Sequence, residues 1–378
     1  MMLLCITTQP VIAWGGLTHY SINRDAGKDS TEELSAAIAP DAFHDFYYGN
    51  SGLGAFVHEE LPGVLYGLLD IPLRNVSVDD SQKRWATGWM THTTADRASH
   101  GTYLSGSPYI DPNNYLSAVG ADTLEKHIMA EFGADILSYW FHEGTITAYI
   151  VIYPDQVGDA FEDYDSNHNT NYAAEYDPCR YMGAFVLLFA TIWTEQVVID
   201  FGQDKKLQFT DWRFLVWAYS NYYNKGYKIY YPCAVDNVTE LILCSSSFNP
   251  TYEQSTDSPD VLPIKSEVHH AESVKIKMDV GKKLIDDGLI MPHKEFNARS
   301  GAVTISFKQA VSDKELAKAY EQYLEEAYEK HTGKKAKFLD EVISRKKPVT
   351  IRDIKKAHPD LYQKLIEEGV IGENKIDR

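Results

Sequence analysis

The chain has 378 residues, which is enough for a well-buried core and about two domains. Its composition, 44% hydrophobic and 24% charged, is that of a folded globular protein and argues against a disordered chain. The formal net charge of -18 disfavours a polyanionic partner such as nucleic acid, and it suits cation binding or extracellular solubility.

The charge is unevenly distributed along the chain. Of the 36 Lys and Arg residues, 23 follow position 264, and so do 20 of the 54 Asp and Glu residues. The preceding part therefore holds 13 basic and 34 acidic residues. With so few basic residues in that part, we do not expect the basic groove that a nuclease uses to bind its substrate.

Residues 1–13 read as a short apolar leader that ends in Val11-Ile12-Ala13, although no Lys or Arg precedes its apolar run. Cleavage after Ala13 would leave Trp14 as the mature N-terminus. The freed α-amino group and the carbonyl of Trp14 form a five-membered chelate for a metal, and His19 follows five residues later. The sequence therefore predicts a secreted, extracellular or cell-surface protein.

From Trp14 to about residue 225 the pattern is helical and rich in aromatic residues. Gly88–His100 and Thr123–Tyr139 carry apolar residues at three- and four-residue spacing, which predicts helices. Asp163–Asn171 is polar and predicts a surface loop. Met182–Val198 is apolar for only about twelve residues, short of the roughly 20 that a bilayer requires, so we expect a buried helix and no transmembrane span.

After Tyr227 the helical period is lost, and residues 226–264 are expected to form a loop-rich extension and linker. Cys233 and Cys244 would close a loop there if they were paired. Residues 265–378 are expected to form a smaller, mainly helical accessory region. Its Lys-rich helices offer peripheral contact with an anionic membrane as the alternative reading.

Two helices are predicted within that accessory region, Ser273–Asp287 and Asp313–His331, both amphipathic and charge-laced. Gly288 and Gly369 each follow a similar Lys-Leu-Ile-acid-acid segment, which favours left-handed helix caps. The predicted fold class is therefore all-α, with a multi-helix domain over residues 14–225.

The interior of that domain contains metal-ligand residue types at helical spacing. His92, Asp96 and His100 are four residues apart and share one face of the predicted helix. His127 and Glu131 repeat this spacing on the next helix. Imidazoles beside carboxylates suit zinc. Taken singly, each of these elements also fits a salt bridge, a helix cap or a core histidine, as do Asp41 and His58 upstream.

In chain order the elements read Trp-Gly-x3-His, Pro-Asp, His, His-x3-Asp-x3-His and His-x3-Glu. This order resembles the zinc-dependent phospholipase C family, which is related to the single-strand-specific zinc nucleases of fungi and plants. The resemblance covers Trp14 to about Asn224. In one respect the chain departs from it, because the best-known members place five residues, not three, between the bridging Asp and the next His.

The resemblance implies up to three zinc ions in one cleft. It assigns the first ion to Asp41, His58, His92 and Asp96, the second to His100, His127 and Glu131, and the third to the amino and carbonyl groups of Trp14 with His19 and the bridging Asp96. It also implies hydrolysis of a phosphoester by a metal-bound hydroxide, with Asp41 as general base or water orienter.

Three readings of the function stay open at this point. The first is a phospholipase C-like hydrolase acting on a phospholipid or another small phosphoester, with Trp85, Trp89 and the nearby Tyr47, Tyr48, Phe56 and Tyr66 as walls for a cationic headgroup. The second is a nuclease or nucleotidase of the same superfamily. The third is a surface protein that binds metal without turnover.

Overall fold

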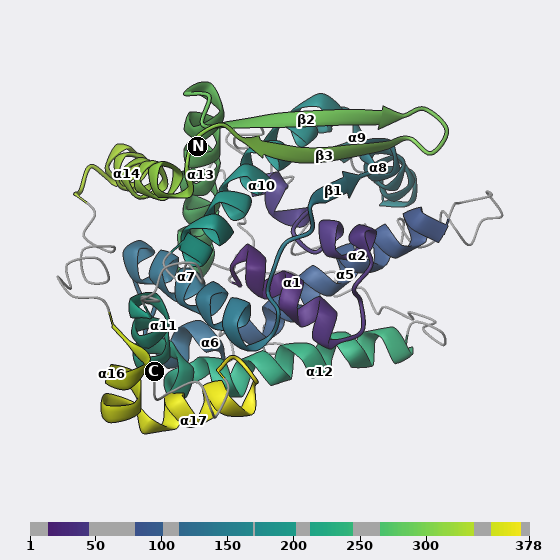
Figure 1. The fold of residues 1–378 in the computed structure, drawn as a ribbon. Coiled ribbons are helices and arrows are strands. Elements are labelled where there is room, and N and C mark those ends of the chain that lie inside the picture. Colours follow the sequence, from purple (N-terminus) through teal and green to yellow (C-terminus); the bar gives the residue numbers. More distant parts are fainter. Residues whose placement is uncertain are drawn as a thin grey trace, which may run out of the picture.

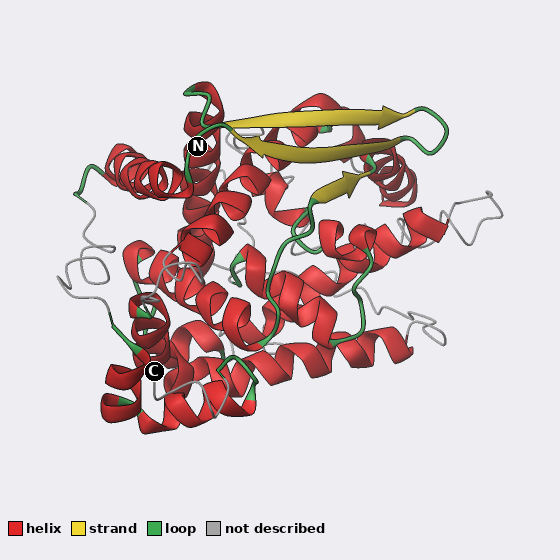
Figure 2. Ribbon diagram, viewed as in Figure 1, coloured by secondary structure: helices red, strands yellow, loops and turns green. Residues whose placement is uncertain are grey.

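The computed structural model describes residues 14–44, 80–100, 113–168, 171–201, 212–244, 265–335 and 349–371. Most of these residues are helical, which agrees with the expected all-α class (Figure 2). The expected leader, residues 1–13, lies outside the described residues, as does His58.

The helices before the long gap at residue 244 are α1 (Gly16–Asp25), α2 (Thr31–Ala36), the 3-10 turn η1 (Pro40–His44), α5 (Asp80–His100), α6 (Tyr115–Val119), α7 (Leu124–Phe141), α8 (Pro154–His168), α9 (Tyr172–Glu175), α10 (Pro178–Phe201), α11 (Arg213–Ala218), the π-helical segment η2 (Tyr219–Tyr227) and α12 (Lys228–Cys244). Those after it are α13 (Lys265–Asp286), α14 (Asp313–Thr332), α16 (Ile351–Ala357) and α17 (Pro359–Glu367). The predicted helices over Gly88–His100, Thr123–Tyr139, Ser273–Asp287 and Asp313–His331 are confirmed as parts of α5, α7, α13 and α14.

A small antiparallel sheet joins the first and second halves of the chain, which the sequence did not predict. Its order is β1 (Tyr149–Ile152), β3 (Ala302–Gln309) and β2 (Ile290–Asn297). β1 pairs with β3 in the register Ile150↔Ile305, so a strand from the first half is hydrogen-bonded to a hairpin from the second. Figure 1 shows this sheet along one edge of the molecule, with α12 at the opposite edge.

One continuous hydrophobic core includes residues from both sides of the expected linker. Within it, α10 packs along α13, and α13 in turn packs on α7 and α14. The backbones of α10 and α13 approach closely at Gly281, where an added Cβ would lie 2.0 Å from the Leu187 carbonyl oxygen. The hydroxyl of Thr191 also donates to the carbonyl of Lys277 across this contact. The accessory region is therefore packed directly on the helices that precede it.

The buried helix expected at Met182–Val198 is confirmed as α10, which carries the buried Phe185, Phe189 and Glu195. By length and composition alone, Pro178–Asp200 could cross a bilayer, with a mean hydropathy of 1.7. However, 67% of its apolar window is buried inside the protein, which also fits a core helix.

Two local expectations are wrong. Residues 228–244 form α12 instead of a loop-rich segment, because Tyr231, Ala234 and Val238 recur at helical spacing and are buried against the core. Along one helix, positions 233 and 244 lie about 16 Å apart, too far for the disulfide considered from the sequence. In the expected surface loop Asp163–Asn171, helix α8 continues to His168.

The predicted glycine caps are confirmed. Gly288 and Gly369 both adopt a φ of 69°, the left-handed conformation that glycine enters without steric cost. At the end of α13, the amide after Gly288 donates to the carbonyl of Leu284 at 3.0 Å, which closes the last turn.

We expect Gly281→Ala to destabilise the protein, because its methyl group would collide with the backbone of α10. Overpacking of this kind costs about 1–3 kcal/mol. The matched control is Gly183→Ala in α10, where an added Cβ meets nothing within 4 Å and helix propensity favours alanine. Thermal unfolding should show a lower midpoint for Gly281→Ala and an equal or higher one for Gly183→Ala. Equal midpoints for the two variants would contradict the close approach.

Candidate metal centre

The helical face predicted on α5 brings one carboxylate between two imidazoles. Asp96 Oδ2 lies 3.2 Å from His92 Nε2, and Asp96 Oδ1 lies 3.3 Å from Nε2 of His19 on α1. The two imidazole rings stack with their centroids 4.3 Å apart. All three side chains are buried. α1 and α5 thus meet through donors of the kind that bind zinc.

A backbone hydrogen bond fixes the orientation of the His92 ring. Its Nδ1 lies 2.7 Å from the carbonyl oxygen of Ala37. Because a carbonyl only accepts, Nδ1 donates the proton, and in the neutral ring Nε2 carries the lone pair. Nε2 faces Asp96 and also Asp41, whose Oδ1 is 3.4 Å away. An imidazole held by one nitrogen and presenting the other is the usual arrangement of a metal-ligating histidine.

Asp41 connects this group to a second one. It lies on η1, one turn before His44, and its Oδ1 is 3.6 Å from Nε2 of His270 on α13. One ligand atom from each of Asp41, His44 and His270 fits within a group no more than 4.8 Å across. The three side chains are buried.

Glu131 on α7 is the centre of the third group. Its Oε1 lies 3.1 Å from His127 Nε2 and 2.6 Å from His270 Nδ1. Its Oε2 accepts hydrogen bonds from Ser273 Oγ at 2.8 Å and from Lys277 Nζ at 2.7 Å. One oxygen therefore faces imidazoles, and the other is held by α13.

Together these contacts form a row in which imidazoles and carboxylates alternate, hereafter the imidazole–carboxylate row. Its members in spatial order are His19, Asp96, His92, Asp41, His270, Glu131 and His127. Neighbouring nitrogen and oxygen atoms are 2.6–3.6 Å apart, and no member is more than 4% exposed. Five separate elements contribute to it: α1, η1, α5, α7 and α13.

Contacts within the row shift the pKa values of Asp41 and His270, and the pKa of the adjacent His44 is shifted as well. Burial disfavours the charged carboxylate of Asp41, but His92 and His270 outweigh it and hold the pKa of Asp41 well below its ordinary value. Burial likewise opposes protonation of His270, yet Glu131 and Asp41 raise its pKa to about 9. The pKa of His44, in contrast, is well below its ordinary value because of burial and the neighbouring His270. The carboxylate of Asp41 is thus ionised and needs cationic partners.

Several buried atoms of the row lack hydrogen bonds of normal geometry. Among them are both carboxylate oxygens of Asp96, Oδ1 of Asp41 and Nε2 of His19. Their nitrogen–oxygen distances, 3.2–3.4 Å, are those of ion pairs. Buried polar atoms are rarely left in this state, and a divalent cation would satisfy them. The residues present therefore fit zinc or a similar ion, although its identity is not fixed by them.

The structure brings together six of the residues predicted from the sequence: His19, Asp41, His92, Asp96, His127 and Glu131. His100 is the last residue of α5, and its side chain lies outside the described part of the chain. Trp14 is buried, and its indole Nε1 donates to the carbonyl of Ala95 at 3.0 Å, the residue before Asp96. This contact ties the expected N-terminal ligand to the helix that carries Asp96.

Sequence reasoning missed four residues of the site: His44, His270, Ser273 and Lys277. His44 follows Asp41 by three residues in one helical turn, and this spacing was the available signal for it. His270, Ser273 and Lys277 lie at helical spacing on a face of α13 that had been read as part of an accessory region. The available signal in the sequence was the helical spacing of these three polar residues.

The aromatic residues expected around the ligands are not all available to a substrate. Trp85 and Trp89 are fully buried, and Trp85 Nε1 donates to the carbonyl of Val151 at 3.0 Å. Both belong to the core, and Tyr47, Tyr48, Phe56 and Tyr66 lie outside the described residues.

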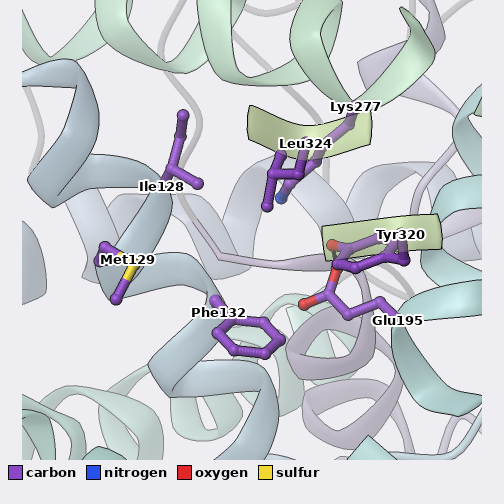
Figure 3. A pocket seen from close by; sticks show the side chains of 7 residues that line it. All are labelled: Ile128, Met129, Phe132, Glu195, Lys277, Tyr320 and Leu324. Atoms are coloured by element: carbon purple, nitrogen blue, oxygen red, sulfur yellow. Dashed lines mark hydrogen bonds between the residues drawn. The ribbon is translucent and has the colours of Figure 1, made fainter. Parts of the chain in front are cut away.

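A small pocket is lined in part by Lys277, next to the imidazole–carboxylate row. Apolar side chains of α7 and Leu324 form its walls, and Glu195 and Tyr320 point into it beside the ammonium group (Figure 3). The pocket contains none of the predicted ligands. Lys277 donates to Glu131 at 2.7 Å, so this side chain connects the pocket with the row.

Comparison with known proteins does not identify a family. No family model matches the chain, and no solved structure matches it significantly. An uncharacterised protein of Archaeoglobus fulgidus is 32% identical over 98 residues, which cover 24% of this chain and 27% of that protein. The chain thus matches only about a quarter of that relative's length.

We expect the metal-free protein to lose stability as the pH rises. Because the pKa of His270 is raised to about 9 in the folded chain, its protonated form stabilises the fold. This contribution is complete below about pH 6.5, the ordinary pKa of histidine, and is lost as the pH rises through about 9. In chelator-treated protein, the thermal midpoint should therefore fall over this interval.

His270→Gln should flatten this pH dependence, whereas His293→Gln, at an exposed position of β2, should leave it unchanged. The same slope in His270→Gln as in the unsubstituted protein would show that another group causes it.

Proposed function

We propose that the protein is a metal-dependent phosphoester hydrolase of the phospholipase C-like kind, with zinc as its ion and up to three ions bound. The observation that carries this proposal is the convergence of Asp41 and Asp96 on Nε2 of His92, with all three side chains buried. Two carboxylates beside one oriented imidazole are suited to hold neighbouring cations.

The three donor groups, two of which share His270, support more than one ion. The group of Asp41, His44 and His270 shares His270 with the group of His127 and Glu131, and Asp41 lies 3.4 Å from His92 of the remaining group. When bound, a close pair of divalent ions supplies a hydroxide near neutral pH and offsets the charge of a phosphoryl group.

Asp41 is placed to act as a base or to orient the attacking water. Its carboxylate faces the imidazoles of both His92 and His270, and its lowered pKa keeps it ionised at neutral pH. It would orient the attacking water and take its proton. His92 and His270 would keep the carboxylate in place, since they approach the same oxygen, Oδ1, from two sides.

For the substrate we propose a phospholipid or another small phosphoester, and for the location a secreted or cell-surface site. The strongly acidic first 264 residues support a substrate with a cationic group over a polyanionic strand. A nuclease or nucleotidase activity, and a metal-binding surface protein without turnover, are separate outcomes of the tests below.

Asp41→Asn should reduce hydrolysis of a nitrophenyl phosphodiester by about 10²–10⁴-fold, because the amide cannot accept the proton of the attacking water. Asp236→Asn, at an exposed position of α12, is the matched control and should keep full activity. Steady-state rates with zinc, and after treatment with a chelator, measure the effect.

Phosphatidylcholine and single-stranded DNA, assayed beside the nitrophenyl ester, separate the phospholipase from the nuclease. Turnover that survives both Asp41→Asn and chelation would contradict the proposal. Metal binding without turnover of any phosphoester would favour the surface-protein reading.

A chain that begins at Trp14 should bind one more zinc ion than a chain that keeps residues before it, because only the former has a free α-amino group there. The indole contact with Ala95 and the short separation from His19 favour this ligand set. Elemental analysis of the two purified forms measures the difference. Equal zinc contents would remove the N-terminal ligand and leave the other groups in place.

A further inference from the structure

The described part of the C-terminal region supplies a histidine to the buried row, and neither the resemblance nor the comparisons assign it a role. We propose that His270 of α13 is a ligand of the second metal ion, together with His127 and Glu131 of α7. The bound ion would thereby link α13 to α7. This inference rests on the proposed metal-dependent function and extends its site across the expected linker.

The donor geometry supports this ligand set. One atom from each of His127, Glu131 and His270 lies within 4.8 Å of the others, and none of the three side chains is more than 1% exposed. Both imidazoles approach the same oxygen, Glu131 Oε1, at 3.1 and 2.6 Å. Two imidazoles and one carboxylate around a common point are a typical zinc ligand set.

The second oxygen of Glu131 explains why Oε1 is the one presented to the imidazoles. Oε2 is held by Ser273 and Lys277, which follow His270 by three and seven residues on one face of α13. The same helix thus orients the carboxylate from behind and supplies an imidazole in front. Residues that hold a ligand in this way raise the affinity of a site for its metal.

The position of α13 is fixed by more than this contact. Its close approach to α10 at Gly281 and the hydrogen bond from Thr191 also position the helix, and a bound ion would add to these contacts. His270 is therefore delivered to the site by a rigid element, and its Nε2 is also 3.6 Å from Asp41. Asp41, a proposed ligand of the first ion, thus lies beside a proposed ligand of the second.

A structural alternative exists for the same contacts. A protonated His270 would bridge Asp41 and Glu131 as a cation and stabilise the fold without binding metal. The two roles differ in what His270→Cys would do, because a thiolate binds zinc and cobalt but cannot replace the bridging cation.

The test uses the full chain, stripped of metal and reloaded with zinc or with cobalt. We expect His270→Ala to bind one ion fewer than the unsubstituted protein, and His270→Cys to recover it. With cobalt, His270→Cys should show a new thiolate-to-cobalt charge-transfer band in the near ultraviolet. His293→Cys, at an exposed position of the same region, is the matched control and should show none.

Hydrogen exchange provides a second readout. Zinc should slow amide exchange across α13 in the unsubstituted protein and in His270→Cys, but not in His270→Ala. Should His270→Ala fail to fold, the cobalt band and zinc protection of His270→Cys decide the question.

An unchanged zinc content in folded His270→Ala, or the absence of the band in cobalt-loaded His270→Cys, would overturn the inference. Lack of phosphoester turnover in the unsubstituted protein would instead reject the proposed function and leave the metal result standing.

Discussion

The burial of three carboxylates in one row of imidazoles is the constraint on which the centre of this molecule depends. Asp41, Asp96 and Glu131 are almost fully shielded from water, and an unpaired buried charge costs several kcal/mol. Imidazoles from α1, α5, α7 and α13 surround them, and Lys277 completes the pairing at Glu131. These four helices, which are far apart in the sequence, must therefore meet at the row.

This constraint accounts for features elsewhere in the fold. α5 lies so close to α2 that a Cβ at Gly88 would meet the Glu33 carbonyl oxygen at 2.1 Å. The neighbouring Ala37 offers its carbonyl to His92, so the packing of α2 on α5 also orients a ligand. Gly281 likewise allows the close approach of α13, which carries His270, to α10. Close backbone contacts at these two positions therefore help to fix the helices that carry the site.

Helices and ligands with local spacing were predictable from the sequence. His92 with Asp96 and His127 with Glu131 are four residues apart, and a helix places such pairs together whatever the rest of the chain does. His270 was not predictable in this way, because its neighbours in the row are Glu131 and Asp41, far away in sequence. Likewise, the pairing of β1 with β3 joins strands that are far apart in the sequence, so no local sequence pattern predicts it. α12 was missed because Pro232 and the mixed polarity of its surface masked a narrow buried stripe.

The contacts of Glu131 also bear on how the chain reaches its native state. His270, Ser273 and Lys277 are 139, 142 and 146 residues beyond it, so α7 is synthesised long before the groups that neutralise its buried acid. Contacts of such long sequence separation form late, since loop closure must precede them. Until α13 docks, Glu131 has to stay hydrated, and α7 cannot settle fully against the core. Final consolidation of the helical body therefore waits for the last third of the polypeptide.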